Sequence, residues 1–172
     1  KLIFTIFSVA VLVPFQCVML PLLAEMGKLN MINMPGLMLV NLGFGSSMSI
    51  ILFHGFMKNV PVELEEAASI DGASQPRIFF TIVLPLIKGI AVTVAILNVM
   101  SLWNDYLLPS LTINRSGTQT LPLRTYLFFG AYTKKWNLGS AALVMAIIPV
   151  IIFYVLCQKH IIKGVTEGAV KG

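Results

Sequence analysis

Four long apolar stretches, separated by polar connections, dominate the pattern of hydrophobic and polar positions along the chain. They cover residues 2–23, 34–56, 78–108 and 138–158, and residues 89–104 within the third carry no charge. A membrane-spanning helix needs about 20 predominantly apolar residues. The strands of a transmembrane barrel would alternate apolar and polar residues, whereas these stretches are continuously apolar. The pattern therefore predicts an all-α, polytopic membrane helix bundle with four transmembrane helices.

Small residues and prolines predict how these helices are built. Pro14 lies inside the first stretch, where a membrane helix tolerates it if neighbouring groups satisfy the carbonyls that it leaves free. Small residues four positions apart let a neighbouring helix approach closely, so we expect tight helix contacts along the second and fourth stretches. The pairs with this spacing are Gly43 and Ser47, Gly45 and Ser49, and Ala142 and Ala146.

Composition supports a membrane location and excludes several other classes. Of the 172 residues, 57% are hydrophobic and only 11% are charged, whereas a soluble domain has about a quarter charged residues. The net charge is +5, but no run of basic residues with interleaved aromatics supports nucleic-acid binding. Cys17 and Cys157 lie in apolar stretches, so we expect buried free thiols and neither a disulfide nor a metal site. His54 and His160 lack neighbours at ligand spacing.

The connections assign the two sides of the membrane. Residues 58–77 form the cytoplasmic loop, and residues 109–137 form the extracytoplasmic loop, in which residues 121–132 are expected to form a short interfacial helix or re-entrant segment. Cytoplasmic loops carry an excess of Lys and Arg. With both chain ends inside, seven basic residues are cytoplasmic and five are outside, which favours this orientation. The cytoplasmic set is Lys1, Lys58, Arg77, Lys88, Lys159, Lys163 and Lys171, and the outer set is Lys28, Arg115, Arg124, Lys134 and Lys135.

Residues 58–77 predict a helix, a sharp turn and a second helix at the membrane surface. Pro61 suits the first turn of a helix, and the carboxylates that follow suit a helix N-terminus. Gly72 can adopt the left-handed conformation that ends a helix. Ser74 is a good N-cap for the second helix, with Pro76 in its opening turn.

The charge of this loop indicates its partner. Four acids and two bases between Lys58 and Arg77 give the loop a net charge of −2. A juxtamembrane helix that binds anionic lipid should be basic, so this element suits a basic groove on a protein, where Glu66 can pair with an arginine. A solvated acidic loop remains the alternative that the charge alone leaves open.

Several motifs together resemble one protein family. Glu66-Ala67-Ala68, Gly72 and Ile82-x-Leu84-Pro85 match the loop signature of ABC importer permeases. Trp103-Asn104-Asp105-Tyr106, Thr120-Leu121-Pro122-Leu123 and the ending from Gln158 to Gly172 are similar to the carbohydrate-importer, MalG-like branch. The resemblance covers residues 1–172 as a single transmembrane domain. Such permeases usually have six membrane helices, and the chain begins with Lys1 rather than methionine, so we expect two further helices to precede it.

The resemblance implies a function and a set of partners. We expect a permease subunit, not an enzyme, that imports a sugar or oligosaccharide through the cytoplasmic (inner) membrane as a multi-pass protein. The expected partners are a second permease subunit, two ATP-binding cassette ATPase subunits, an extracytoplasmic solute-binding protein, the sugar and the lipid bilayer. This chain itself needs no cofactor, because ATP and Mg²⁺ are bound by the ATPase.

Two groups of residues are candidates for this function. The coupling residues that contact the ATPase are Glu65, Glu66, Ala67, Ala68, Asp71, Gly72 and Ala73. Polar groups within a membrane are functional candidates by default, and sugars are bound by hydrogen bonds and aromatic stacking. The substrate-path candidates on this basis are Asn98, Ser101, Trp103, Asn104 and Asp105, although a cap or anchor at the outer end of its stretch explains Asp105 better. Lys88-Gly89 departs from the family, because many relatives have a proline there that bends the helix.

Three other functions are less well supported. An intramembrane enzyme needs a nucleophile with a partnering base or a metal, and an ion-coupled secondary transporter needs acids at mid-membrane depth. The stretch 89–104 contains no acid. An ABC permease for an amino acid, a peptide or an ion shares the Glu66-Ala67-Ala68 loop. Only the Trp103–Tyr106 region and the chain's ending favour a carbohydrate over these solutes.

Overall fold

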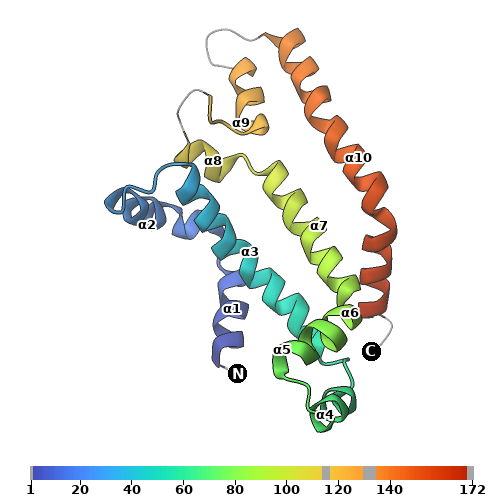
Figure 1. Ribbon diagram of the computed structural model, residues 1–172. Coiled ribbons are helices and arrows are strands. Elements are labelled where there is room, and N and C mark those ends of the chain that lie inside the picture. The colour runs from blue at the N-terminus through green and yellow to red at the C-terminus, as the bar shows by residue number, and fades with distance from the viewer. Residues whose placement is uncertain (1, 114–116, 130–134, 170–172) are drawn as a thin grey trace.

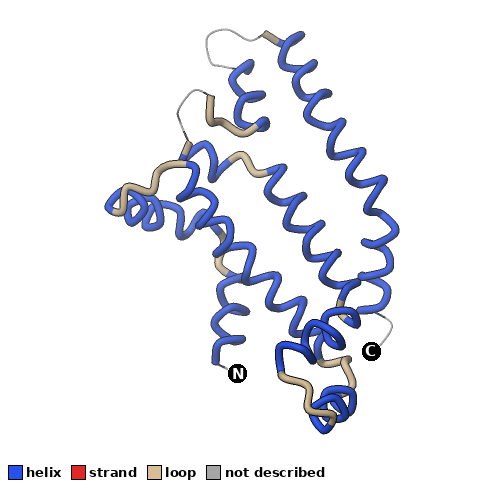
Figure 2. The backbone as a smooth tube through the Cα atoms, viewed as in Figure 1, coloured by secondary structure: helices blue, strands red, loops and turns tan. Residues whose placement is uncertain are grey.

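The computed structural model describes residues 2–113, 117–129 and 135–169, with side chains described as far as Gln158. Within these ranges every regular element is helical and no strand is present, as Figure 2 shows. The elements are α1 (Leu2–Leu12), α2 (Phe15–Lys28), α3 (Met34–Met57), α4 (Val62–Ile70), α5 (Gln75–Ile78), a π-helical turn (Phe79–Val83), α6 (Leu84–Leu86), α7 (Lys88–Asn104), α8 (Leu107–Thr112), α9 (Leu121–Tyr126), a 3-10 turn (Leu127–Phe129) and α10 (Trp136–Ala169). The predicted all-α class is confirmed.

Two of the four predicted spans are single, unbroken helices. These are α3 and the part of α10 from Trp136 to Gln158, which are both long and apolar enough to cross a membrane. The other two are bent. α1 and α2 meet at 105°, and the segment Gln75–Leu86 meets α7 at 75°. The prediction of four spans therefore holds only if each bent pair is counted as one.

Both bends have local causes. The first follows α1 and precedes Pro14, which has no amide hydrogen for the helix ladder and restricts the residue before it. The second centres on Ile87, whose φ and ψ are −91° and 8°. Pro85 cannot donate to the preceding turn, and the π-helical turn before it has already interrupted the regular ladder. A bend is therefore present next to Lys88-Gly89 without a proline at either of those positions.

The expectation that both cysteines are buried is wrong for Cys17. Cys17 on α2 is exposed rather than buried, and Cys157 is partly buried. By contrast α1 runs along α3, where the Phe4 ring stacks on His54 at a centroid distance of 4.2 Å. His54 is otherwise exposed, so this ring contact lies at the surface of the described helices.

The main helices run between two ends of the molecule (Figure 1). The start of α1, the element α4 and the end of α10 lie at one end, whereas α8 and α9 lie at the other. This arrangement matches the predicted grouping of the chain ends with the loop at residues 58–77. α9 with its 3-10 turn supplies the helix predicted within 121–132, of which residues 130–132 lie outside the described residues.

Two small hydrophobic cores hold the described helices, one at each end. The core near α4 centres on Ile78, Val83 and Ile87, with Ala68 and Ala73 packed against it. The other core joins α3, α8 and α9, and its buried residues are Leu37, Leu108, Ile113 and Leu123. Between these cores, large apolar side chains on α1, α3 and α10 remain exposed. Such a surface suits lipid or neighbouring membrane helices.

Candidate functional site

The predicted helix-turn-helix is present at residues 61–78. Pro61 has extended backbone and immediately precedes α4, so the helix begins at Val62 rather than at the proline itself. Glu63 and Glu65 occupy the first turn, where carboxylates interact favourably with the helix N-terminus. Ser74 stands at the N-cap position of α5, although its side chain makes no capping hydrogen bond.

A Schellman motif ends α4. The amide of Ala73 donates to the carbonyl of Ala68 at 3.0 Å, and the amide of Gly72 donates to the carbonyl of Ser69 at 3.1 Å. Gly72 has a φ of 79°, in the left-handed region that glycine adopts without steric cost. The turn predicted from this glycine is confirmed, and it redirects the chain from α4 into α5.

α4 is fixed on one side and unpaired on the other. Ala68 packs against the core that contains Ile78 and Ile87, so the methyl group holds the helix close to the base of the bundle. Glu66 and Asp71 are exposed on the same short element, and Ile70 is 87% exposed. Among the side chains that the structure describes, no lysine or arginine pairs with an acid of α4 or with Asp71. An acidic edge beside an exposed isoleucine is suited to a partner that is both basic and apolar.

The coupling candidates thus divide by burial. Ala68 and Ala73 are packed against the core, Glu65 is partly buried, and Glu66, Ala67, Asp71 and Gly72 are exposed. Glu65 to Ala68 lie on α4, and Asp71 to Ala73 lie in the turn that follows it.

The five substrate-path candidates, in contrast, do not form one site. Asn98 and Ser101 line a cavity of about 210 Å³ between α3 and α7. Trp103 and Asn104 line a different cavity of about 420 Å³ between α7, α9 and α10. Asp105 follows the last residue of the bent span Gln75–Asn104, and its Oδ1 accepts the amide of Leu108 at 3.4 Å. Asp105 thus stands at the C-cap position of α7, one residue before the N-cap Tyr106 of α8, and its carboxylate anchors the first turn of α8.

Burial also affects the Asp105 carboxyl. Desolvation raises the pKa of Asp105 above 3.8, and the backbone amides of Leu108 and Leu107 partly oppose that rise by hydrogen bonding to the charged form. A carboxylate used in this way stabilises a helix start just outside the span.

Three further polar or small residues from α3 complete the cavity beside Asn98. They are Asn41, Gly45 and Ser49, which follow one another at intervals of four along one face of α3. The Nδ2 of Asn98 donates to the Oγ of Ser49 at 3.1 Å. None of these three residues was a substrate-path candidate in the sequence. Gly45 and Ser49 were predicted as a small pair, and continuing their spacing of four back to Asn41 is the signal that finds the third.

Aromatic side chains dominate the second cavity. The indole Nε1 of Trp103 donates to the carbonyl of Ala146 on α10 at 3.4 Å, so the predicted small pair on α10 does admit a close neighbour. The rings of Tyr106 and Tyr126 lie 4.7 Å apart, and Phe129 completes the wall. This cavity is predominantly apolar and lies near the α8 and α9 end of the molecule.

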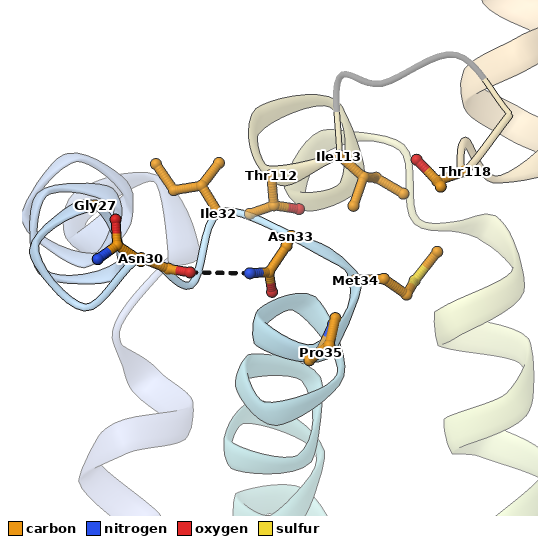
Figure 3. A pocket seen from close by; sticks show the side chains of 9 residues that line it. All are labelled: Gly27, Asn30, Ile32, Asn33, Met34, Pro35, Thr112, Ile113 and Thr118. Carbon is orange, nitrogen blue, oxygen red and sulfur yellow. Dashed lines mark hydrogen bonds between the residues drawn. The ribbon is translucent and has the colours of Figure 1, made fainter.

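A third and larger cavity of about 590 Å³ opens at that same end, beside the connection from α2 to α3 (Figure 3). Asn33 shapes its floor, because its Oδ1 accepts the amide of Gly36 at 2.9 Å while its Nδ2 donates to the carbonyl of Asn30 at 2.9 Å. Asn30 has a φ of 54°. The lining residues are Gly27, Asn30, Ile32, Asn33, Met34, Pro35, Thr112, Ile113 and Thr118.

Comparison with known proteins gives a consistent result. Residues 1–167 match the protein family described as "Binding-protein-dependent transport system inner membrane component". The chain is 51% identical over 170 residues to "Probable starch degradation products transport system permease protein AmyC" of Thermoanaerobacterium thermosulfurigenes, which covers 99% of this chain and 62% of that protein.

Two further relatives have similar coverage. The "Multiple sugar-binding transport system permease protein MsmG" of Streptococcus mutans is 36% identical over 173 residues, covering 99% of this chain and 62% of the relative. The "Melibiose/raffinose/stachyose import permease protein MelC" of Bacillus subtilis is 34% identical over 174 residues, covering 100% and 63%. The chain therefore spans less than two thirds of the length of these relatives.

Proposed function

The chain belongs to the family of binding-protein-dependent transport system inner membrane components, and on that premise we propose that it is part of an ABC permease subunit that imports a sugar or oligosaccharide. The protein provides a path through the cytoplasmic membrane and performs no bond chemistry. The observation that carries the proposal is the match over residues 1–167, together with relatives whose names specify starch products, multiple sugars and raffinose-type sugars.

The proposed partners follow from the need for energy and for solute capture. A second permease subunit closes the path, two ATPase subunits bind ATP and Mg²⁺, and an extracytoplasmic solute-binding protein delivers the sugar. Binding of ATP must favour one of two arrangements of the permease pair, because a ligand shifts an equilibrium only through differential affinity.

We propose that the ATPase binds α4. Its acids have no basic partner among the described side chains, so an arginine on the ATPase can pair with Glu66 without displacing an internal contact. Because Ala68 packs on the core formed by Ile78 and Ile87, a displacement of α4 is transmitted directly to the start of α7. In this scheme Glu66 binds the ATPase, and the apolar contact of Ala68 transmits the movement to the rest of the permease.

Co-purification tests the docking role. Full-length protein expressed with its partner subunits is changed at Glu66→Lys, which reverses the charge of an exposed acid on α4. We expect ATPase recovery to fall by about tenfold or more, since a like charge then faces the basic groove, while membrane insertion is unchanged. Glu25→Lys is the matched control, because Glu25 is an exposed acid on α2. Equal ATPase recovery from both variants would contradict the docking role.

Uptake into proteoliposomes tests the solute class. The assembled transporter is supplied with its solute-binding protein and a panel of labelled sugars, amino acids and peptides. ATP-dependent accumulation of a sugar alone is expected. Accumulation of an amino acid, a peptide or an ion in its place would identify a permease for that solute instead.

A further inference from the structure

The segment Gln75–Leu86 lies across the end of the bundle next to α4. It meets α7 at 75°, and α7 runs lengthwise through the bundle (Figure 1). The segment therefore runs closer to the plane of the membrane than to its normal. The proposed function puts α4, and this segment with it, at the cytoplasmic face. A helical segment in that position lies at the level of the lipid headgroups.

Apolar side chains of this segment face two ways, and the bundle covers only one of them. Ile78 is buried in the core near α4. Phe79 and Phe80 remain exposed, Phe80 to 64%, and their rings meet edge-to-face with centroids 5.2 Å apart. Leu84 and Leu86 are exposed as well. Uncovered rings and leucines suit the boundary between headgroups and acyl chains, where an interfacial helix buries its apolar side.

Three basic residues lie beside the same core, and we call them the basic rim: Lys58, Arg77 and Lys88. Arg77 and Lys88 are the direct sequence neighbours of the buried Ile78 and Ile87, and Lys58 lies two positions from residues packed against that core. All three side chains are exposed. Among the side chains that the structure describes, none of the three forms an ion pair.

The acids of α4 leave the basic rim free. Four acids lie between Lys58 and Arg77 in the sequence, and α4 packs beside α5, yet none of these acids pairs with either base in the described structure. The two signs of charge are thus separated, with the acids on α4 and the bases beside the core. A basic groove that receives the acids of α4 would repel the basic rim. The rim therefore needs a second, anionic partner.

A phospholipid with an anionic headgroup supplies both features that the rim and the rings require. Its phosphate is negatively charged, and the planar guanidinium of Arg77 can bind a phosphate through two parallel hydrogen bonds. The long stems of Lys58 and Lys88 let their ammonium groups reach the headgroups while their methylene groups stay on apolar surface. Free phosphate would satisfy the charge but leave the rings in water. The acyl chains of a lipid cover them.

Resting on the proposed function, we propose that the basic rim, together with Phe79 and Phe80, binds anionic phospholipid of the cytoplasmic leaflet. The headgroup phosphates contact the rim, and the acyl chains pack on the two rings. Bound lipid holds the segment that joins α4 to α7, so the charge of the leaflet affects the contact through which the ATPase acts on the permease.

Lipid retention by the assembled full-length transporter tests this site. The complex is titrated in detergent with dioleoylphosphatidylglycerol, which is anionic, and with dioleoylphosphatidylcholine, which is zwitterionic, and bound lipid is counted by native mass spectrometry. Each Lys or Arg near an anionic surface contributes about fivefold in affinity, so the triple variant Lys58→Gln, Arg77→Gln, Lys88→Gln should reduce the preference for phosphatidylglycerol by about tenfold or more.

Two further variants separate charge from apolar contact. The triple variant Lys28→Gln, Arg124→Gln, Lys135→Gln is the matched control, because it removes three exposed bases at the α8 and α9 end, and it should keep the preference. The double variant Phe79→Ala, Phe80→Ala should weaken retention of both lipids alike, since both have the same acyl chains. An unchanged preference in the rim variant, or an equal loss in the control, would overturn the site.

A photocrosslink identifies the occupant even if the rim variant fails to assemble. Phe80 is replaced by p-benzoylphenylalanine, an aromatic-for-aromatic change at an exposed position, in transporter reconstituted into vesicles with equal parts of the two lipids. We expect adducts with phospholipid that are enriched in phosphatidylglycerol. Adducts with the second permease subunit or with an ATPase subunit in place of lipid would overturn the site.

The two proposals fail in different ways, because lipid retention is measured without a sugar. Transport of another solute would contradict the proposed function and leave the preference for phosphatidylglycerol intact. Sugar transport by a protein whose rim variant keeps that preference would contradict only the lipid site.

Discussion

Replacement of Gly72 by alanine isolates the backbone conformation of the turn after α4. A Cβ at this position would meet no heavy atom within 4 Å, so any effect must come from the φ of 79° and not from a clash. A left-handed conformation costs an L-residue about 1–2 kcal/mol. The Schellman motif, whose amides belong to Gly72 and Ala73, should open more often by a factor of about 5 to 30.

Hydrogen exchange of the Ala73 amide measures this opening directly. The full-length protein in lipid nanodiscs is compared with Gly72→Ala and with Gly72→Asn, because asparagine tolerates the left-handed region better than alanine does. We expect the exchange rate of the Ala73 amide to be lowest in the wild type, higher in Gly72→Asn and highest in Gly72→Ala. Gly55→Ala is the control, since Gly55 also has no neighbour within 4 Å of an added Cβ but does not have a positive φ.

Either of two results would refute this reasoning. Equal exchange in Gly72→Ala and wild type would show that the turn does not require the left-handed conformation. If Gly55→Ala changed the exchange rate of the Ala73 amide as much as Gly72→Ala does, the effect would not be specific to the turn.

Three further predictions concern the α2–α3 end. Gly36→Ala places a Cβ 1.8 Å from the carbonyl oxygen of Met31, so we expect the free energy of unfolding to fall by about 2–4 kcal/mol, with a clear fall in Tm. In Gly43→Ala, the control, the added Cβ meets nothing within 4 Å, so Tm should stay unchanged or rise. Asn33→Ala removes the side-chain cap of α3 and should lower stability by about 1 kcal/mol, and an unaltered Tm would show that the cap contributes nothing. Glu25→Gln breaks an ion pair with Lys28 whose side chains are 64% and 69% exposed. The free energy of unfolding should therefore fall by no more than the roughly 0.5 kcal/mol typical of such pairs, and a much larger loss of stability would contradict that value.

The helix-turn-helix was predictable because its signals are local. Pro61, Gly72 and Ser74 each act on the few residues beside them, through a missing amide, an allowed left-handed φ and a capping position. Those effects do not depend on the rest of the fold. The structure accordingly agrees with the sequence here to within one residue.

The bends were not predictable from the same chain. Hydrophobicity measures how apolar a stretch is, but it carries no information on the direction of the helix axis. The hydrophobic pattern of residues 2–23 is therefore the same for one straight helix and for two helices that meet at 105°. Pro14 is compatible with a kinked helix or with a complete break, and packing decides between them. The bend at Ile87 arises from Pro85 and the π-helical turn, neither of which states a direction in the sequence.

The cavity beside Asn98 shows a third kind of limit. Asn98 is separated from Ser49 by 49 residues, and their contact depends on how α3 and α7 rotate about their own axes. The repeat of small and polar residues on α3 indicates one contact face, but nothing in the sequence states which helix meets it. The structure shows that Gly43 and Ser47 line a cavity with α1 and α2, whereas Gly45 and Ser49 face α7.

The 75° angle between Gln75–Leu86 and α7 has a mechanical consequence. Two rigid arms joined almost at a right angle convert a push along the shorter arm into a torque on the longer one. The short arm follows α4 after the turn at residues 71–74, so a lateral shift of α4 would swivel α7 about Ile87 rather than slide it along its axis. A helix that swivels changes which of its faces lines the interior, and a straight helix pushed from its end would not.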